Sequence, residues 1–263
     1  MNTGLHGKTA IVTGSSKGIG KAIALAFANE GVRLTLCARN ENLLTQTENE
    51  IKDRFHTEVI SIKANVAKLN DIKRTVNKTL NKFKRIDILV NNAGSLAYGG
   101  IDEFDDKLFE EHLFTRLLSA IRFAKEVIPI MKRQGGGKII NIAGINGVFP
   151  EQKFLINSMI NGAILNFTRA LALELASDKI NVNAVNPFYT NTEQTIQIFN
   201  SLAVKENIPY EEIINRFSKI VPMSRFASPD DVAFAVVYLA SDSANFLTGI
   251  SINVNGGIIS GTL

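Results

Sequence analysis

The segment TGSSKGIG, Thr13 to Gly20, places three glycines just before an apolar, helix-like stretch. Glycines allow a tight turn and let backbone N–H groups approach a pyrophosphate, and the N-terminus of the following helix adds partial positive charge. Such a turn is a weak signal alone, but this one follows the first strand-like run, KTAIVTG at 8–14. The segment therefore predicts a dinucleotide-binding site.

The second strand-like run ends in LCARN, and its residues indicate which dinucleotide is bound. Ala38 stands where an acidic residue would hold a ribose 2′-hydroxyl. Arg39 follows it, and Lys17 lies in the glycine-rich turn. Because cations suit a 2′-phosphate, and guanidinium–phosphate pairs are strong and directional, we expect NADP(H) to be preferred over NAD(H). The alternative is that Arg39 is an exposed arginine at a strand end.

The apolar segment FLINSMINGAILNFTRALALEL, at 154–175, carries Asn157 and Asn161 four residues apart, on one side of a helix. Its apolar residues are spread too widely for a surface helix, so we expect a buried one. Side-chain amides form hydrogen bonds but do not transfer a proton near neutral pH. Since buried amides need partners, we expect these two to bond to a ligand, or else to the protein or ordered water.

Strand-like runs alternate with helix-length segments along the whole chain. The runs lie at 8–14, 32–38, 58–64, 86–94, 137–143, 180–186 and 250–257. Near-continuous Val, Ile and Leu favour strands that are buried on both faces, and strand–helix alternation requires right-handed crossovers. The pattern predicts an α/β fold with a doubly wound parallel sheet, the Rossmann fold, with helices on both faces.

We expect residues 1–263 to form a single domain, because this length, with 45% hydrophobic and 21% charged residues, suits one soluble α/β core. The stretch at about 188–228 lies outside the strand–helix alternation and reads as a helical insertion. Ligands of such sheets bind beyond the carboxyl ends of the strands. The insertion is therefore expected to be a substrate lid, with a packing or dimerisation element as the alternative.

Composition excludes several other classes of protein. The chain shows no leader pattern and no apolar run long enough to span a membrane, and its single cysteine, Cys37, allows no disulfide framework. We therefore expect a cytoplasmic protein, and we expect no metal site. The net charge of +4 comes from basic residues spread along the chain, which argues against a nucleic-acid surface.

Five motifs together resemble those of the short-chain dehydrogenase/reductases over nearly the full length. They are TGSSKGIG at 13–20, NNAG at 91–94, GKIINIAG at 137–144, INVNAVNP at 180–187 and LTGISINVNGG at 247–257. The chain looks like a divergent branch similar to 3-oxoacyl-(acyl-carrier-protein) reductases. The resemblance implies a Rossmann fold of about seven strands and a homo-oligomer, a tetramer or dimer. It implies cofactor contacts at Gly14, Ser15, Ser16, Lys17, Gly18, Ile19, Gly20, Arg39, Asn65, Val66, Asn92, Ala93, Gly94, Asn161, Pro187 and Thr192.

The resemblance also implies four catalytic positions, and all four are substituted in this chain. The family pattern is a Ser, a Tyr thirteen residues later, a Lys four residues after the Tyr, and an Asn in the preceding long helix. Alignment of the motifs puts Gly144 at the Ser, Asn157 at the Tyr, Asn161 at the Lys and Arg116 at the Asn. The Tyr is the proton donor of the family reaction, and loss of general acid catalysis typically costs on the order of 10² to 10⁴ in rate.

Two other side chains, and Arg116 itself, could act in the altered site. His112 lies one helical turn before Arg116, and Tyr189 follows the sixth strand, so either could donate a proton. Arg116 is always charged and suits a carboxylate or phosphate. Its alternative role is a salt bridge, to Glu110, to Glu111 or across an oligomer contact.

Two functions agree with these residues. We expect an NADP(H)-dependent oxidoreductase with a non-standard active site that acts on a small molecule. The alternative is a catalytically inactive dinucleotide-binding protein with a sensing or assembly role. A retained glycine-rich turn beside a substituted tetrad is consistent with both.

Overall fold

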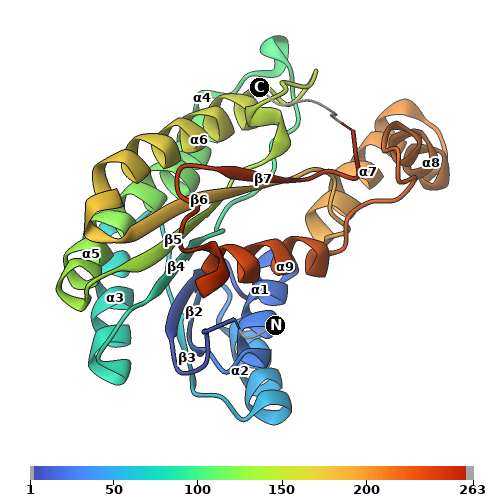
Figure 1. Cartoon of the computed structure of the whole chain (residues 1–263). Coiled ribbons are helices and arrows are strands. Elements are labelled where there is room, and N and C mark those ends of the chain that lie inside the picture. The colour runs from blue at the N-terminus through green and yellow to red at the C-terminus, as the bar shows by residue number, and fades with distance from the viewer. Residues whose placement is uncertain (1–2, 259–263) are drawn as a thin grey trace.

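The computed structural model describes residues 3–258, in which strands and helices alternate as predicted (Figure 1). The strands are β1 (Thr9–Thr13), β2 (Arg33–Ala38), β3 (Val59–Lys63), β4 (Ile88–Asn91), β5 (Gly137–Ile142), β6 (Ile180–Pro187) and β7 (Ser251–Val254). The helices are α1 (Gly18–Asn29), α2 (Glu41–Phe55), α3 (Leu69–Phe83), α4 (Asp106–His112), α5 (Ser119–Gln134), α6 (Leu155–Leu175), α7 (Glu193–Glu206), α8 (Tyr210–Ile220) and α9 (Pro229–Ala240). Within these residues, no helix is both long and apolar enough to cross a lipid bilayer.

The seven strands form one parallel sheet in the order β3-β2-β1-β4-β5-β6-β7. Ala10 of β1 pairs with Leu34 of β2 on one side and with Ile88 of β4 on the other. The chain first builds the sheet outward from β1 to β3 and then crosses back to β4, so the direction of building reverses between β1 and β4. Sheets of this kind bind ligands at that switch point. The predicted doubly wound α/β fold is confirmed.

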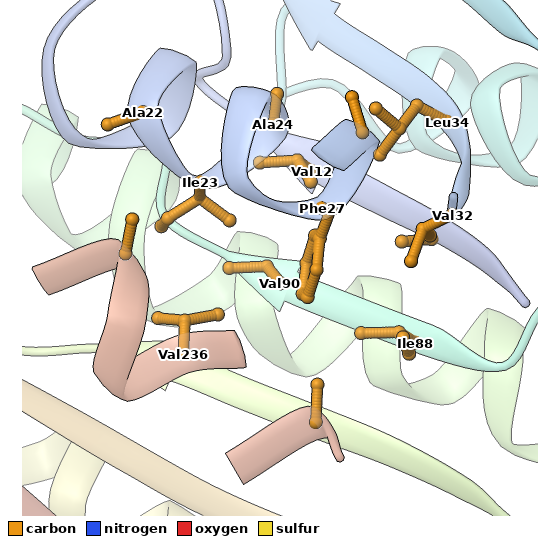
Figure 2. Packing of buried hydrophobic residues seen from close by; sticks show 14 of the residues in the cluster. Val12, Ala22, Ile23, Ala24, Phe27, Val32, Leu34, Ile88, Val90 and Val236 are labelled. Atoms are coloured by element: carbon orange, nitrogen blue, oxygen red, sulfur yellow. The ribbon is translucent and has the colours of Figure 1, made fainter. Parts of the chain in front are cut away.

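Side chains of each strand alternate between two apolar layers. On one face, Val12 and Val90 pack against α1 and α9, where Phe27 is fully buried (Figure 2). On the other face, Ile11 and Leu89 pack with residues of α3, α5 and α6. Because helices cover both faces, apolar residues are needed at every position of a central strand, which explains the near-continuous Val, Ile and Leu runs.

The predicted long helix before β5 is interrupted at a position that matters for the site. The α4 helix ends at His112, a π-helical turn spans Leu113–Leu118, and α5 begins at Ser119. A π-helical turn widens the helix locally and changes the direction of its side chains, and such turns are frequent at functional sites. Arg116 lies inside this turn.

Between β6 and α9, the helices α7 and α8 pack together to one side of the sheet (Figure 1). Their shared core is largely aromatic. The rings of Phe199 and Phe217 stack with centroids 4.8 Å apart, and the ring of Tyr189 meets both edge-on. This core attaches α7 and α8 to the segment that follows the end of β6.

Candidate active site

A cavity of about 430 Å³ lies at the carboxyl ends of β1, β4, β5 and β6, beside the switch point of the sheet. Most residues predicted for the cofactor or for catalysis line it. They are Gly14, Ser16, Lys17, Gly18, Ile19, Gly20, Arg39, Asn65, Val66, Asn92, Ala93, Gly94, Arg116, Gly144, Asn161, Pro187 and Thr192. Three predicted residues, Ser15, His112 and Asn157, are not part of the lining.

The glycine-rich turn is held tightly against the end of β4. Gly14 has a φ of 67°, and a Cβ atom on Gly20 would lie 2.2 Å from the Gly14 carbonyl oxygen. The Asn92 Nδ2 group donates to the Thr13 and Gly14 carbonyl oxygens, at 2.9 and 3.3 Å. A side chain at Gly20 would therefore push the turn and the N-terminus of α1 apart.

Ser15 has a structural role in this turn. Its hydroxyl oxygen accepts a hydrogen bond from the Cys37 backbone N–H at 3.0 Å, and the residue is fully buried. This bond ties the turn to β2. The predicted contact between Ser15 and a cofactor is therefore not supported by the position of its side chain.

The two cations predicted to bind a 2′-phosphate both line the cavity, and each faces a carboxylate. Lys17 Nζ lies 2.5 Å from Glu193 Oε2 at the start of α7, and Arg39 Nη1 lies 3.8 Å from Glu111 Oε1. The Arg39 side chain is 71% exposed. Because both pairs are open to solvent, their strength is small and a phosphate could displace the carboxylates.

Asn65 and Val66 line the cavity after β3, where the resemblance implies contacts with the cofactor. The Asn65 Oδ1 atom accepts from the Ala67 backbone N–H at 3.0 Å, and the Asn65 backbone N–H donates to Asp71 at 2.8 Å. The amide oxygen thus fixes its own loop. It keeps a second lone pair for a further donor, such as an adenine amino group.

Arg116, Asn161 and Asn146 form a directed chain of hydrogen bonds on the cavity wall. The Arg116 Nη2 group donates to Asn161 Oδ1 at 2.7 Å and to the Ala143 carbonyl oxygen at 3.2 Å. A guanidinium group has no acceptor, so the Asn161 oxygen must face it, and Asn161 Nδ2 donates onward to Asn146 Oδ1 at 2.6 Å. The chain therefore ends at the Asn146 amino group, a donor.

Gly144 lies against this chain and leaves no room for a side chain. A Cβ atom there would lie 2.6 Å from Asn161 Nδ2 and 3.2 Å from Asn146 Oδ1. A serine at this position would therefore displace the Asn161 amide.

Asn157 bonds to the protein instead of facing the cavity. The residue is fully buried. Its Oδ1 atom accepts from the Ala97 backbone N–H at 3.3 Å, while its Nδ2 group donates to the Ala97 carbonyl oxygen. The two amides of the predicted helix therefore differ: Asn157 anchors the loop after β4, and Asn161 lines the cavity.

Arg116 carries a charge that no carboxylate within residues 3–258 pairs with. Its two acceptors are neutral oxygen atoms, and its Nη1 atom is buried without a hydrogen-bond partner. Burial lowers the pKa of the Arg116 guanidinium to about 10. Of the carboxylates expected to bind it, Glu111 instead faces Arg39.

His112 is too enclosed to serve as the proton donor. It is fully buried and does not line the cavity, and its Nε2 atom lies 3.3 Å from the Ser95 hydroxyl oxygen. Burial, and secondarily the charge of Arg116, lowers the pKa of the imidazole. The neutral form is therefore favoured, and within residues 3–258 the ring hydrogen-bonds only to Ser95, which lines the cavity.

Tyr189 lines the cavity together with an acidic residue that sequence reasoning missed, Glu151. The Tyr189 hydroxyl donates to Glu151 Oε1 at 3.2 Å. Burial raises the pKa of both side chains, so each is a weaker acid than usual. Glu151 is the only acidic residue in the segment 143–154, between β5 and α6, and that position was the signal that could have identified it.

The residues after β6 close the cavity on the side of α7. Phe188 and Tyr189 line it with ring centroids 4.1 Å apart. Thr192 caps α7, because its hydroxyl oxygen accepts from the Thr195 backbone N–H at 3.4 Å. The predicted contact of Thr192 with a cofactor is compatible with its place in the lining, beside Gly18.

Comparison with known proteins identifies the family. A family model described as enoyl-(acyl carrier protein) reductase matches residues 14–259. The chain is 33% identical over 256 residues to dehydrogenase/reductase SDR family member 4 of Caenorhabditis elegans, covering 96% of this chain and 95% of that protein. It is 32% identical over 252 residues to the 3-oxoacyl-(acyl-carrier-protein) reductase FabG of Staphylococcus epidermidis, covering 95% and 98%.

Among solved structures, the L-sorbose reductase of Gluconobacter frateurii, complexed with NADPH and L-sorbose, matches with a TM-score of 0.95 and 32% identity, and all of both chains is covered. The seven-stranded sheet, the glycine-rich turn at its switch point and these full-length matches agree. The chain belongs to the short-chain dehydrogenase/reductase family of oxidoreductases.

Proposed function

We propose that this protein is an NADP(H)-dependent oxidoreductase that acts on a carbonyl or hydroxyl group of a small molecule through a non-standard active site. The observation that carries the proposal is that a single cavity is continuous between two groups of residues. One group is the glycine-rich turn with Lys17 and the nearby Arg39, and the other is the Arg116–Asn161–Asn146 hydrogen-bond chain. We propose residues 1–263 as one domain, with the segment 188–228 as the lid over this cavity.

The residues present fit a phosphorylated dinucleotide. Gly14 and Gly18 have positive φ angles and open the turn, and Lys17 and Arg39 place cations at the end of the cavity that follows β1 and β2. The L-sorbose reductase, whose structure contains NADPH, supports the choice of cofactor. When bound, the reduced nicotinamide supplies a hydride to the carbonyl carbon.

We propose that the positions of the family tetrad are Gly144, Asn157, Asn161 and Arg116, so that the chemistry of the site differs from that of its relatives. Negative charge builds up on the carbonyl oxygen as the carbon is reduced, and preorganised donors stabilise such charge. The Arg116 guanidinium, at one of these positions, and the Asn146 amino group, at the end of the hydrogen-bond chain, are donors for this charge. Asn161 holds Arg116 in place, as an acceptor.

Binding and turnover, measured separately, test the proposal. We expect the protein to enhance NADPH fluorescence on binding and to consume NADPH with at least one member of a panel of activated ketones, aldehydes and oxo acids. Arg116→Gln should abolish turnover while NADPH still binds. Arg122→Gln is the matched control, because Arg122 lies in α5, outside the cavity lining, and donates to the Ala67 carbonyl oxygen.

Saturable NADPH binding with no turnover on any carbonyl would contradict the enzymatic proposal and support the inactive dinucleotide-binding alternative. Failure to bind either dinucleotide would contradict both. We also propose a cytoplasmic homo-oligomer, with sedimentation as its test.

A further inference from the structure

The charged side chains that line the cavity fall into two groups. Lys17 pairs with Glu193, and Arg39 faces Glu111. The remaining two, Arg116 and Glu151, form no ion pair with any side chain in residues 3–258, nor with each other. The same cavity thus contains one cation, Arg116, and one acid, Glu151, that have no ion-pair partner among residues 3–258, at separate places on its wall.

Arg116 marks the end of the cavity near Gly94 and Gly144. Its side chain lies across Gly94, where a Cβ atom would meet it at 2.9 Å. Only the neutral oxygens of Ala143 and Asn161 accept from it, and its Nη1 atom is buried without an acceptor. A desolvated guanidinium with neutral partners is stabilised when an anion enters beside it.

Glu151 marks a different part of the wall, among aromatic rings. The Tyr189 hydroxyl donates to one carboxyl oxygen, Oε1, which leaves Oε2 for another donor. Phe154, Phe188 and Tyr189 line the cavity around it. A carboxylate beside aromatic rings favours a cation, because the ring quadrupoles and the carboxylate attract the same charge.

Burial of Arg116 and Glu151 without ion-pair partners costs free energy, and a bound ligand with the opposite charges offsets that cost. We propose that the substrate carries an acidic group that binds beside Arg116 and a protonated amine that binds between Glu151 and the aromatic rings. This substrate class rests on the proposed function, since it is the ligand of the same cavity. The substrate is therefore an amino-substituted carbonyl acid or the corresponding hydroxy acid.

Linear amino acids of graded length are simple probes of this arrangement. The series from 4-aminobutanoate to 8-aminooctanoate, with hexanoate and hexylamine as singly charged controls, is titrated calorimetrically into the protein, free and saturated with NADP⁺. One member of the series should bind about tenfold or more tightly than either control, because both charges are satisfied at once. NADP⁺ affinity is measured first, so that failure of the cofactor site is seen independently of the probes.

Two variants assign each charge to its residue. Glu151→Gln should reduce the affinity of the best amino acid to that of hexanoate, without changing the affinity of hexanoate itself. Arg116→Gln should reduce it to that of hexylamine. Tyr189→Phe keeps both charged groups and is expected to retain the preference. If Arg116→Gln does not fold, Glu151→Gln tests the proposal by itself.

Equal affinity for the amino acids and the singly charged controls would overturn the proposal. So would a loss in Glu151→Gln that affects hexanoate as strongly as the amino acid. Either result with normal NADP⁺ binding leaves the proposed oxidoreductase function intact.

Discussion

Replacement of Asn157 by alanine separates a structural role from a catalytic one. Asn157 is fully buried, and its amide makes a two-way bond with the backbone of Ala97. In Asn157→Ala, the Ala97 N–H and C=O groups both lose this partner. Ala97 is itself 6% exposed, so water reaches the freed groups poorly.

The expected loss of stability follows from these two groups. A buried polar group left without its hydrogen bond costs about 1–3 kcal/mol, so two cost about 2–6 kcal/mol in the free energy of unfolding. A loss of this size lowers the Tm of a domain of this length by several degrees or more. NADPH affinity should also fall, because the loop held by Asn157 continues from Asn92, Ala93 and Gly94 of the cavity wall.

Urea denaturation with and without saturating NADPH measures both effects. Ser158→Ala is the matched control, since Ser158 follows on the same helix and its hydroxyl donates only to the Phe154 carbonyl oxygen one turn earlier, at 2.9 Å. The control is expected to lose about 1 kcal/mol or less. If Asn157→Ala were as stable as the control while turnover collapsed, Asn157 would contact the ligand and the structural role would be wrong.

Three further outcomes are expected. Arg39→Ala should weaken NADPH roughly tenfold to a hundredfold and leave NADH nearly unchanged, as for one charge-assisted phosphate contact; equal losses, by fluorescence titration, would remove Arg39 from the phosphate site. Glu193→Gln should tighten NADPH by up to about fivefold, since Lys17 no longer has to leave a half-exposed ion pair, and a weaker complex would contradict this. The chain should sediment as a dimer or tetramer at micromolar concentration, because apolar side chains such as Leu173 and Phe246 are 85% and 102% exposed; a monomer would refute this.

The fold could be predicted because its signals are local. The strands β1, β2, β4 and β5 are largely apolar runs of four to six residues, and each run is followed by a helix-length segment, so the sequence alone specifies βα alternation and hence a parallel sheet. The glycine-rich turn is also local: Gly14 and Gly20 must approach one another within a single turn of chain. The location of the end of the cavity proposed for the dinucleotide followed from these two features.

The chemistry of the other end depended on contacts between distant segments. Asn157 and Asn161 are indistinguishable in type and lie on one side of one helix, yet Asn157 meets the loop after β4 and Asn161 meets Arg116, 45 residues away in sequence. A π-helical turn, which no periodicity in the sequence indicated, places Arg116 where it reaches Asn161.

The pairing of the charged side chains in the cavity also depended on contacts between distant segments. The sequence identified Lys17 and Arg39 as cations but could not show that Glu193 and Glu111 face them, nor that no carboxylate within residues 3–258 pairs with Arg116. Glu151 became a candidate site residue only from the structure, in which the segment after β6 places Tyr189 beside it although the two are 38 residues apart in sequence. Residue types and local periodicity determined the helices, the strands and the glycine-rich turn. The pairing of buried polar groups was decided by which strand ends the sheet brings together. The reason is that hydrogen bonds and ion pairs act over a few ångströms of space and not along the chain.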